Sequence, residues 1–258
     1  MTQHVIGAQL YTVRQYTKTI EDVRETLKKV AQIGYTAVQV SGFGPVDTKE
    51  VAQAAEDNGL TICCTHVGWD DFLKDADAVI EKHQAWKCTH PAIGGLWQDK
   101  YKGIDGIQVF ADELAPVAEK LAKAGMDFSY HNHDHEFWKL PNGKTWLETL
   151  YDTIPAAHLK AELDVFWVQA GGADPAAWVR KMAGRQPLLH LKDMVMTEAR
   201  ERHFAPIGEG NMNWPAILDA ARDSGVHWML VEQDDCYGAD PFEALATSYK
   251  NLRGMGLR

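Results

Sequence analysis

Short apolar segments rich in β-branched residues alternate with amphipathic segments along the whole chain. The first apolar segment, VIGAQL at 5–10, has the composition of a buried strand. The segment 19–34 that follows it is amphipathic, and its apolar side chains recur at helical spacing, at Ile20, Val23, Leu27 and Val30. The pattern therefore predicts a strand followed by a helix, and the same pairing recurs to the end of the chain.

The chain contains eight apolar segments of this kind. They are 5–10, 35–42, 60–67, 88–95, 126–133, 159–167, 187–194 and 227–234. Because a helical pattern follows each of them, the alternation predicts a parallel sheet, and eight units in 258 residues match a closed α/β fold, the (β/α)8 TIM barrel. An open doubly wound sheet is the alternative, but no GxGxxG turn follows the first strand. We expect residues 1–258 to form one barrel domain.

Two prolines refine the helical predictions. Pro116 lies inside the long amphipathic segment 106–125 and predicts a kink or a break near residue 115. Pro175 directly follows Asp174, and this pair is typical of a helix that begins with an aspartate N-cap and a proline in its first turn.

The composition is that of an ordinary globular protein, with 45% hydrophobic and 24% charged residues. The first residues show no basic stretch followed by an apolar one, and no apolar run approaches the roughly 18 residues that a membrane span needs. The four cysteines show no CxxC spacing, and adjacent Cys63 and Cys64 would point to opposite faces of an extended strand. We expect reduced core cysteines in a cytoplasmic protein.

The net charge of −10, from 36 acidic and 26 basic residues, disfavours nucleic acid as a partner. Even the densest basic stretch, ARERH at 199–203, contains a glutamate. Nothing in the sequence indicates a membrane contact. We therefore expect a small-molecule substrate, and the sequence leaves open whether the protein forms a homo-oligomer.

Polar side chains stand where the predicted strands end. They are Gln9, Gln39, His66, His131, Asp164, His190, Lys192 and Glu232. Core packing does not explain this set, whereas the active sites of (β/α)8 barrels are built at the carboxyl ends of the strands. Strand alternation turns His190 and Lys192 to one face. In the same way His131 and His133 share a face.

Where two histidines and two carboxylates converge on one barrel mouth, their charges need to be balanced. Close titratable groups repel or stay unpaired unless a cation lies among them, and a divalent ion compensates them directly. The mixed nitrogen and oxygen donors favour Mn²⁺, with Co²⁺, Fe²⁺, Zn²⁺ and Mg²⁺ as alternatives, and leave positions for substrate oxygens. We expect one bound divalent metal ion.

Six short motifs occur in an informative order, namely GAQLYTVR, YHNHDHEF, ELDVFWV, HLKDM, FAPIGEGNMNW and VEQD. Across nearly the whole chain this order resembles the xylose-isomerase-like TIM-barrel superfamily, which includes the sugar phosphate isomerases and epimerases. The resemblance implies a metal ion held by residues from strands five to eight. At those places this chain has His131, Asp164, His190 and Glu232.

The first of these places departs from the family's pattern, because the family's epimerases have a glutamate where this chain has His131. In those enzymes two metal-bound glutamates shuttle a proton between the faces of the substrate. A metal-bound imidazole uses its second nitrogen to hold a neighbour and is a poor shuttle, so Glu232 is left as the single base of the pair. Glu136 is a rival for the first ligand, because it follows the strand on a loop that could fold back.

Further residues are expected near the substrate. His133 and Glu136 either face it or belong to a solvated loop, and Asp134 and His135 are expected to face solvent. Lys192 either binds a ketone oxygen or enediolate, or is a surface lysine paired with its neighbour in the sequence.

Four more residues complete the predicted substrate site. Glu209, in the segment PIGEGNMNW, could reach a sugar hydroxyl or could simply belong to a well-formed loop. Trp167 could stack on the apolar face of a sugar ring. His66 and Gln9 stand at strand ends, where buried polar groups hydrogen-bond ligands or neighbouring side chains.

The expected function is that of a divalent-metal-dependent isomerase or epimerase of a sugar or sugar phosphate. The metal would stabilise an enediolate, and Glu232 or His133 would take the proton. A lyase, dehydratase or hydrolase of a keto-inositol or 3-keto-glycoside shares the first half of this reaction, and the YHNH motif resembles such enzymes as well. A non-catalytic sugar-binding protein and an AP-endonuclease-like nuclease are minor alternatives, and the acidic charge disfavours the nuclease.

Overall fold

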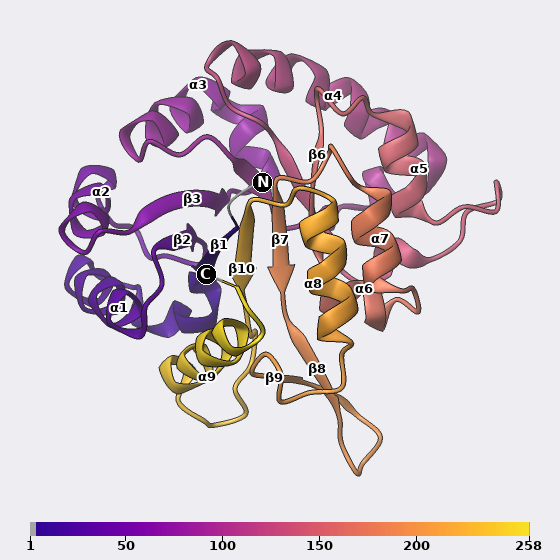
Figure 1. The fold of residues 1–258 in the computed structure, drawn as a ribbon. Coiled ribbons are helices and arrows are strands. Elements are labelled where there is room, and N and C mark those ends of the chain that lie inside the picture. The colour runs from indigo at the N-terminus through magenta and orange to yellow at the C-terminus, as the bar shows by residue number, and fades with distance from the viewer. Residues whose placement is uncertain (1–3, 258) are drawn as a thin grey trace.

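Eight parallel strands close on themselves to form the barrel. The computed structural model describes residues 4–257, and the strands neighbour one another in the order β1-β10-β7-β6-β5-β4-β3-β2 (Figure 1). They are β1 (Val5–Gln9), β2 (Ala37–Val40), β3 (Thr61–His66), β4 (Pro91–Ile93), β5 (Ser129–His131), β6 (Lys160–Asp164), β7 (Leu188–Leu191) and β10 (Trp228–Val231). The predicted (β/α)8 barrel is confirmed, and each predicted strand segment contains one of these strands.

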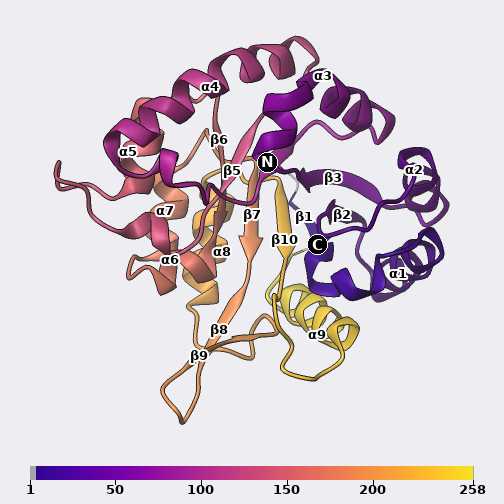
Figure 2. The same ribbon diagram turned by 180° about the vertical axis from the view of Figure 1, so that it is seen from behind.

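Helices follow the strands and surround the barrel (Figure 2). The α-helices are α1 (Ile20–Ile33), α2 (Thr48–Asp57), α3 (Trp69–Ala85), α4 (Gly103–Lys123), α5 (Trp146–Thr153), α6 (Val165–Ala170), α7 (Pro175–Lys181), α8 (Trp214–Asp223) and α9 (Pro241–Gly254). Three short 3-10 helices are η1 (Leu10–Tyr16), η2 (Asp99–Tyr101) and η3 (His135–Phe137). Among the described residues, no helix combines the length and the apolar character that crossing a membrane requires.

One of the two proline-based predictions agrees with the structure, and the other does so only in part. Asp174 accepts a hydrogen bond from the Ala177 N–H, with Pro175 in the first turn of α7, as predicted. The sequence predicted a kink or a break near residue 115, and the break is wrong, because α4 continues through Pro116. The buried Leu114 and Val117 on either side pack this helix against the barrel, and such packing offsets the hydrogen bond that proline cannot donate.

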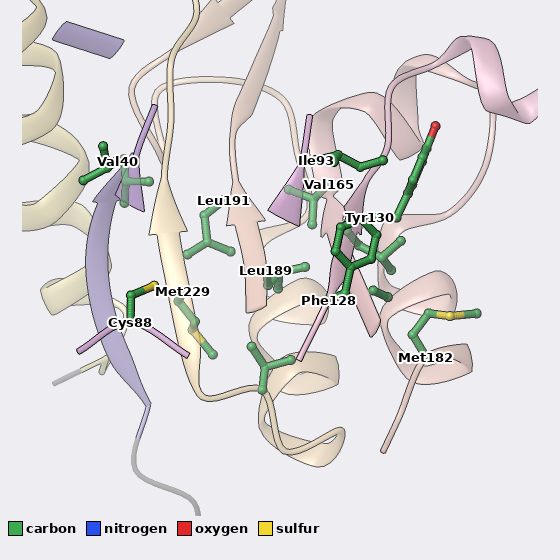
Figure 3. Packing of buried hydrophobic residues seen from close by; sticks show 14 of the residues in the cluster. Val40, Cys88, Ile93, Phe128, Tyr130, Val165, Met182, Leu189, Leu191 and Met229 are labelled. Carbon is green, nitrogen blue, oxygen red and sulfur yellow. The ribbon is translucent and has the colours of Figure 1, made fainter. Parts of the chain in front are cut away.

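Strand alternation separates the barrel interior from the surface that the helices cover. The interior apolar cluster consists of Ala37, Cys63, Cys64, Ala92, Leu188 and Leu230. The residues that alternate with Leu188 and Leu230, among them Leu189, Leu191 and Met229, pack in the core beneath the helices (Figure 3). The apolar interior is therefore small, and polar side chains occupy the layer above it, toward the carboxyl ends of the strands.

Cys63 and Cys64 both face the interior, so the expectation that they point to opposite faces is wrong. The register between β2 and β3 shifts at this point, because Val38 aligns with Ile62 while Gln39 aligns with Cys64. A bulge of this kind inserts one extra residue into a strand and turns two neighbouring side chains to the same side. Both thiols are free, as predicted.

An antiparallel hairpin, which the sequence did not predict, follows β7. It consists of β8 (Asp193–Met196) and β9 (Arg202–Ala205) and extends away from the barrel (Figure 1). The buried Asp193 carboxylate accepts hydrogen bonds from the N–H groups of Gly208 and Gly210 and from Trp214 Nε1 at 2.7–3.1 Å. One buried carboxylate therefore holds the loop between β9 and α8, and Gly210 is required because a Cβ would meet Asp193 Oδ1 at 2.4 Å.

A second buried carboxylate holds the loop after β5. Glu136 is only 2% exposed; it accepts hydrogen bonds from the Tyr130 hydroxyl at 2.8 Å and from the His133 N–H at 2.7 Å. Burial raises the pKa of Glu136 to about 7, although these two hydrogen bonds oppose the shift. Glu136 therefore shapes the histidine-rich loop 131–137 from within.

Asp193→Ala should lower the free energy of unfolding by roughly 3 kcal/mol, because several buried N–H donors lose their acceptor at once. Asp240→Ala is the matched control, since Asp240 caps α9 through a single hydrogen bond to the Phe242 N–H and its loss costs about 1 kcal/mol. Urea unfolding followed by tryptophan fluorescence measures both. Equal losses in the two variants would show that Asp193 is an ordinary cap.

Glu136→Gln should change how stability depends on pH. A carboxyl group whose pKa is raised in the folded protein stabilises it fully below its usual pKa, near 4.5, and this contribution is lost as the pH rises through about 7. The wild type should therefore lose about 2–3 kcal/mol relative to Glu136→Gln between pH 5 and pH 8. Urea unfolding of both proteins at the two pH values tests this, and a pH-independent difference would contradict it.

Candidate active site

A cavity of about 740 Å³ opens at the carboxyl ends of the strands, and we call it the mouth cavity. Its walls include Tyr11, Arg14, His66, Trp69, Asp70, Asp71, Trp97, His131, His133, Lys192, Glu232 and Asp234. Strand ends supply the charged floor, while the loops after β1, β3 and β4 supply the aromatic and acidic rim. The cavity lies where the fold predicts an active site.

Three neighbouring strands carry titratable residues in pairs, two positions apart. The pairs are Glu162 and Asp164 on β6, His190 and Lys192 along β7, and Glu232 and Asp234 after β10. β7 lies between the other two strands, and His190 aligns with Asp164 on one side and with Leu230 on the other. The strand that carries the two cationic side chains is therefore flanked by two anionic strands.

The four predicted metal ligands converge in this charged floor. His131, Asp164, His190 and Glu232 are all buried, and each offers a ligand atom within 4.8 Å of the other three. His131 Nε2 lies 3.3 Å from Asp164 Oδ2, and His190 Nδ1 lies 2.9 Å from Glu232 Oε2. Burial and the nearby positive His190 lower the pKa of His131 to about 4, so its imidazole is neutral at pH 7.

Asp164 is oriented by the helix that follows it. Its Oδ1 accepts hydrogen bonds from the N–H groups of Phe166 and Trp167 in the first turn of α6, at 2.9 and 3.2 Å. Its own N–H donates to the side chain of Asn132 at 3.0 Å. The second oxygen, Oδ2, is left to face His131 and Lys192.

His190 is bounded by acceptors on both sides. Nε2 lies 2.7 Å from Gln39 Oε1 and 3.0 Å from Glu162 Oε1, while Nδ1 faces Glu232. Burial lowers the pKa of His190, but the charges of Glu162 and Glu232 outweigh this and raise it to about 10. The ring is therefore held in one orientation, with Nδ1 toward the cluster and Nε2 toward the barrel interior.

Glu162 was not predicted. This fully buried carboxylate accepts hydrogen bonds from Gln39 Nε2 at 2.9 Å and from His66 Nε2 at 2.8 Å, and it also contacts His190. Burial raises its pKa, and the histidines outweigh this and hold it well below the usual value. Alternation with Asp164 in KAELD was the available signal, because residues two apart on a strand share a face.

Lys192 is buried at 1% exposure and binds three carboxylates. Its Nζ lies 2.9 Å from Asp164 Oδ2, 2.9 Å from Glu232 Oε2 and 3.1 Å from Asp234 Oδ1. Burial lowers the pKa of Lys192, and the three carboxylates more than reverse this, so the ammonium stays charged. The alternative of a surface lysine paired with Asp193 is wrong, because that aspartate faces the loop after β9.

Asp234 was also not predicted. It follows Glu232 by two residues, lines the mouth cavity and is the most exposed of the three carboxylates around Lys192. Burial and the negative Glu232 raise its pKa to about 6, although Lys192 opposes the shift. Its backbone oxygen accepts a hydrogen bond from Arg14 Nη1 at 2.9 Å, which ties this loop to the loop after β1.

The donor set fits a divalent ion. Four carboxylates in the floor face two cationic side chains, so an excess of negative charge remains for an ion to balance. His131 offers a neutral nitrogen, and Glu162 can hold the second nitrogen of His190, as a carboxylate commonly does behind a ligating imidazole. Lys192 binds two of the same oxygens, and Asp234 offers this ammonium a third partner.

His133 and Trp167 lie beside this floor. His133 lines the mouth cavity with its ring 4.9 Å from that of Trp97 and 5.2 Å from that of Trp167. Burial lowers the pKa of His133 to about 2, so the ring is neutral. Lys192 Nζ lies 5.4 Å from the centre of the Trp167 ring, although Trp167 is not part of the cavity wall.

Three predicted site residues lie elsewhere. Gln9 is buried beneath the mouth, where its Oε1 accepts a hydrogen bond from the Tyr11 N–H. Glu136 is held within its own loop and does not join the ligand cluster. Glu209 is exposed outside the cavity wall and accepts a hydrogen bond from Asn251 Nδ2, so the loop interpretation applies to it.

Solved structures with the same fold cover nearly the whole chain. A sugar phosphate isomerase/epimerase from Parabacteroides distasonis has a TM-score of 0.83 at 23% identity, over 99% of this chain and 96% of that chain. An L-ribulose 3-epimerase has a TM-score of 0.75 at 18% identity, over 99% and 95%. D-allulose 3-epimerase from a Methylomonas species has a TM-score of 0.72 at 10% identity, over 98% of each chain. At these identities the likeness shows a shared fold.

Comparison of the sequence with curated proteins and with protein families identifies the family. No curated protein matches the chain significantly. The family described as xylose isomerase-like TIM barrel, however, matches residues 27–254. Since this range covers most of the chain and the structure has the barrel that the description names, the protein belongs to the xylose isomerase-like TIM-barrel family.

Proposed function

We propose that the protein is a divalent-metal-dependent isomerase or epimerase of a sugar. The observation that carries this proposal is the convergence of His131, Asp164, His190 and Glu232 beside Lys192 at the floor of the mouth cavity. The solved structures with this fold that are described as sugar isomerases and epimerases support the same reaction class.

The four ligands would hold the ion, with Mn²⁺ the best match to their mixed nitrogen and oxygen donors, and when bound it would polarise a substrate carbonyl as a Lewis acid. Lys192 contributes from the protein side. Its three N–H groups face Asp164, Glu232 and Asp234, so the ammonium would donate to a substrate oxygen by exchanging Asp234, the most exposed of these partners. The ammonium is already charged and oriented for an oxygen on which negative charge develops. Asp234 keeps this ammonium in place from the cavity side.

Glu232 is the proposed base, and its Oε1 is the proposed acceptor atom. Oε2 contacts His190 and Lys192, whereas Oε1 has no hydrogen-bond partner among the described residues, and Glu232 lines the cavity. Burial raises the pKa of Glu232, but Lys192 and His190 outweigh this and hold it well below the usual value, so the group is ionised.

The proposed reaction passes through an enediolate and relocates a proton that is bound to carbon. Glu232 takes the proton from the carbon next to the substrate carbonyl. The electron pair of that C–H bond forms the carbon–carbon double bond of an enediolate, and the π pair of the carbonyl moves onto its oxygen. Return of the proton to the former carbonyl carbon, together with transfer of the hydroxyl proton to the former carbonyl oxygen, gives the isomer. Its return to the opposite face of the same carbon, as the electron pair on oxygen restores the carbonyl, gives the epimer. His133, which is neutral and lines the cavity, is the second candidate for this proton.

The charges of the mouth cavity favour an unphosphorylated sugar. Asp70 and Asp71 stand at the rim, and the guanidinium of Arg14 already donates hydrogen bonds to two backbone oxygens. A phosphate at the rim would therefore meet two carboxylates and one cation, Arg14, because Lys192 is already paired with three carboxylates. Turnover of a sugar phosphate that exceeds turnover of the same free sugar would contradict this.

A lyase, dehydratase or hydrolase that acts on a keto-inositol or 3-keto-glycoside is the second candidate. The presence of His131 where the family's epimerases have a glutamate favours it, because a single carboxylate base suffices when the enediolate expels a leaving group and is not reprotonated. Incubation in D₂O separates the two. An isomerase incorporates deuterium at the carbon, while an elimination gives an unsaturated or smaller product.

The purified protein should contain about one divalent ion per chain, and Asp164→Ala or His190→Ala should remove it. Metal analysis after dialysis measures the content, and Glu209→Ala, which alters an exposed carboxylate outside the cavity, should keep the ion. Lys192→Met should bind Mn²⁺ about 10-fold more tightly in calorimetric titration, because a competing positive charge is removed. Full metal content in both ligand variants would rule out this site.

Glu232→Gln should reduce turnover by about 10²–10⁴-fold while binding of the sugar changes much less, because the amide keeps an oxygen but cannot accept a proton. Deuterium exchange into the substrate should fall in parallel with turnover. Near-normal turnover would assign the proton to His133, because the Lys192 ammonium is already protonated. Persistent exchange without product would place Glu232 in the second half of the reaction.

A further inference from the structure

A second cavity of about 590 Å³ lies beside the mouth cavity, between the loops that follow β4 and β5. The two cavities share Trp97 and Gln98 in their walls. We call the second one the aromatic side cavity, because most of its wall consists of Leu96, Trp97, Tyr101, Tyr130, Trp138 and Trp146.

The buried aromatic residues present their rings, and not their polar atoms, to this cavity. Trp146 Nε1 donates to the Tyr101 backbone oxygen at 3.1 Å, and the Tyr101 hydroxyl donates to Glu113 at 2.7 Å. The Tyr130 hydroxyl donates to Glu136 at 2.8 Å. Because these hydrogen bonds are made within the protein, the side chains offer apolar surface to a ligand.

The charged side chains around the cavity are also engaged. Lys102 pairs with Asp99 at 2.6 Å, and His135 Nε2 lies 3.3 Å from Glu136 Oε1. Glu136 itself accepts hydrogen bonds from the Tyr130 hydroxyl and the His133 N–H. Polar groups remain in the described wall at the Gln98 amide and at the indole N–H groups of Trp97 and Trp138, whereas the aromatic rings that make up most of the wall suit a planar apolar ring.

The histidine-rich loop separates the two cavities. His131 and His133 line the mouth cavity, whereas His135 and Glu136, in the same loop, line the aromatic side cavity. The Trp97 ring bridges the division, 4.9 Å from the His133 ring and 4.7 Å from the His135 ring. Trp97 and Gln98 therefore form the shared boundary of the two cavities, and a group attached to a sugar in the mouth cavity would reach the side cavity across this boundary.

Two of the tryptophans remain largely uncovered. Trp97 is 63% exposed and Trp138 is 51% exposed. No other tryptophan of the described residues is as exposed as these two. Both line the side cavity. Aromatic surface of this kind gains free energy when a ring covers it, and rings prefer offset or edge-on contacts with one another.

We propose that the aromatic side cavity binds an aromatic substituent carried by the sugar that occupies the mouth cavity. This inference rests on the proposed function for the sugar half of the ligand, while the side cavity supplies the selectivity for the substituent. The substrate class is then a sugar that bears an aryl group, and not a bare monosaccharide.

The test compares three probes, 4-nitrophenyl β-D-glucopyranoside, methyl β-D-glucopyranoside and 4-nitrophenol, in calorimetric titration of the Mn²⁺-loaded protein. The aryl glucoside should bind about 10-fold more tightly than the methyl glucoside. Trp138→Ala should remove this advantage and leave the methyl glucoside unaffected, while Trp138→Phe should retain most of it. Tyr16→Ala is the matched control, because Tyr16 is 44% exposed and lies in neither cavity wall.

Binding of 4-nitrophenol separates this proposal from the proposed function. It should bind the wild type and Asp164→Ala equally, because the side cavity does not include the metal ligands, and Trp138→Ala should weaken it. If neither glucoside binds while 4-nitrophenol still does in this pattern, the aromatic site stands, and what fails is the binding of a glucoside ring in the mouth cavity. Equal affinity of the two glucosides for the wild type, or no effect of Trp138→Ala on any probe, overturns the proposal.

Discussion

Buried carboxylates at the mouth of the barrel have to be balanced by cations, and the arrangement of the site follows from this constraint. An unpaired charge is costly to bury, so each acidic side chain needs a partner with good geometry. β7 provides these partners for the strands on both sides, because His190 and Lys192 both point inward between β6 and β10. The parallel order β6-β7-β10 therefore places positive charge between two negative strands.

The charged side chains form two layers along the barrel axis, and in each layer a cationic side chain balances carboxylates. In the lower layer Glu162 binds His190, with Gln39 and His66 around it, and this group is closed to solvent except at His66. In the upper layer Lys192 binds the carboxylates that face the cavity. The lower layer holds the His190 ring so that Nδ1 points upward, and the upper layer is where a substrate or an ion meets the protein. Preorganised groups of this kind need little rearrangement when charge develops on a ligand.

The loops around the mouth are held by buried side chains rather than by regular structure. Asp193 accepts hydrogen bonds from the N–H groups of the loop after β9, and Glu136 accepts them from the His133 N–H and the Tyr130 hydroxyl. Asp193 directly follows Lys192 and Glu136 lies three residues after His133, yet both residues serve the scaffold. The loop that Glu136 holds has one side toward the charged floor and the other toward aromatic rings, so a single anchor positions the walls of two cavities.

The hydrophobic pattern was sufficient for the barrel, because strand and helix periods and helix caps are local properties. Alternation also correctly turned His131, His190 and Glu232 toward the interior. The same rule failed at Cys63, where a shift in pairing with β2 adds a residue, since register depends on the neighbouring strand.

Partners across the barrel could not be inferred from sequence, because they join residues far apart in the chain. Glu162 and Asp234 were visible as alternating acids beside Asp164 and Glu232, yet their roles depend on His190 and Lys192 from a third strand. Lys192 looked equally compatible with a surface position until the barrel closed around it. The sequence thus specifies which residues face inward, while the order of strands in the closed sheet specifies which charges meet, because Coulomb interactions depend on distance in space and not along the chain.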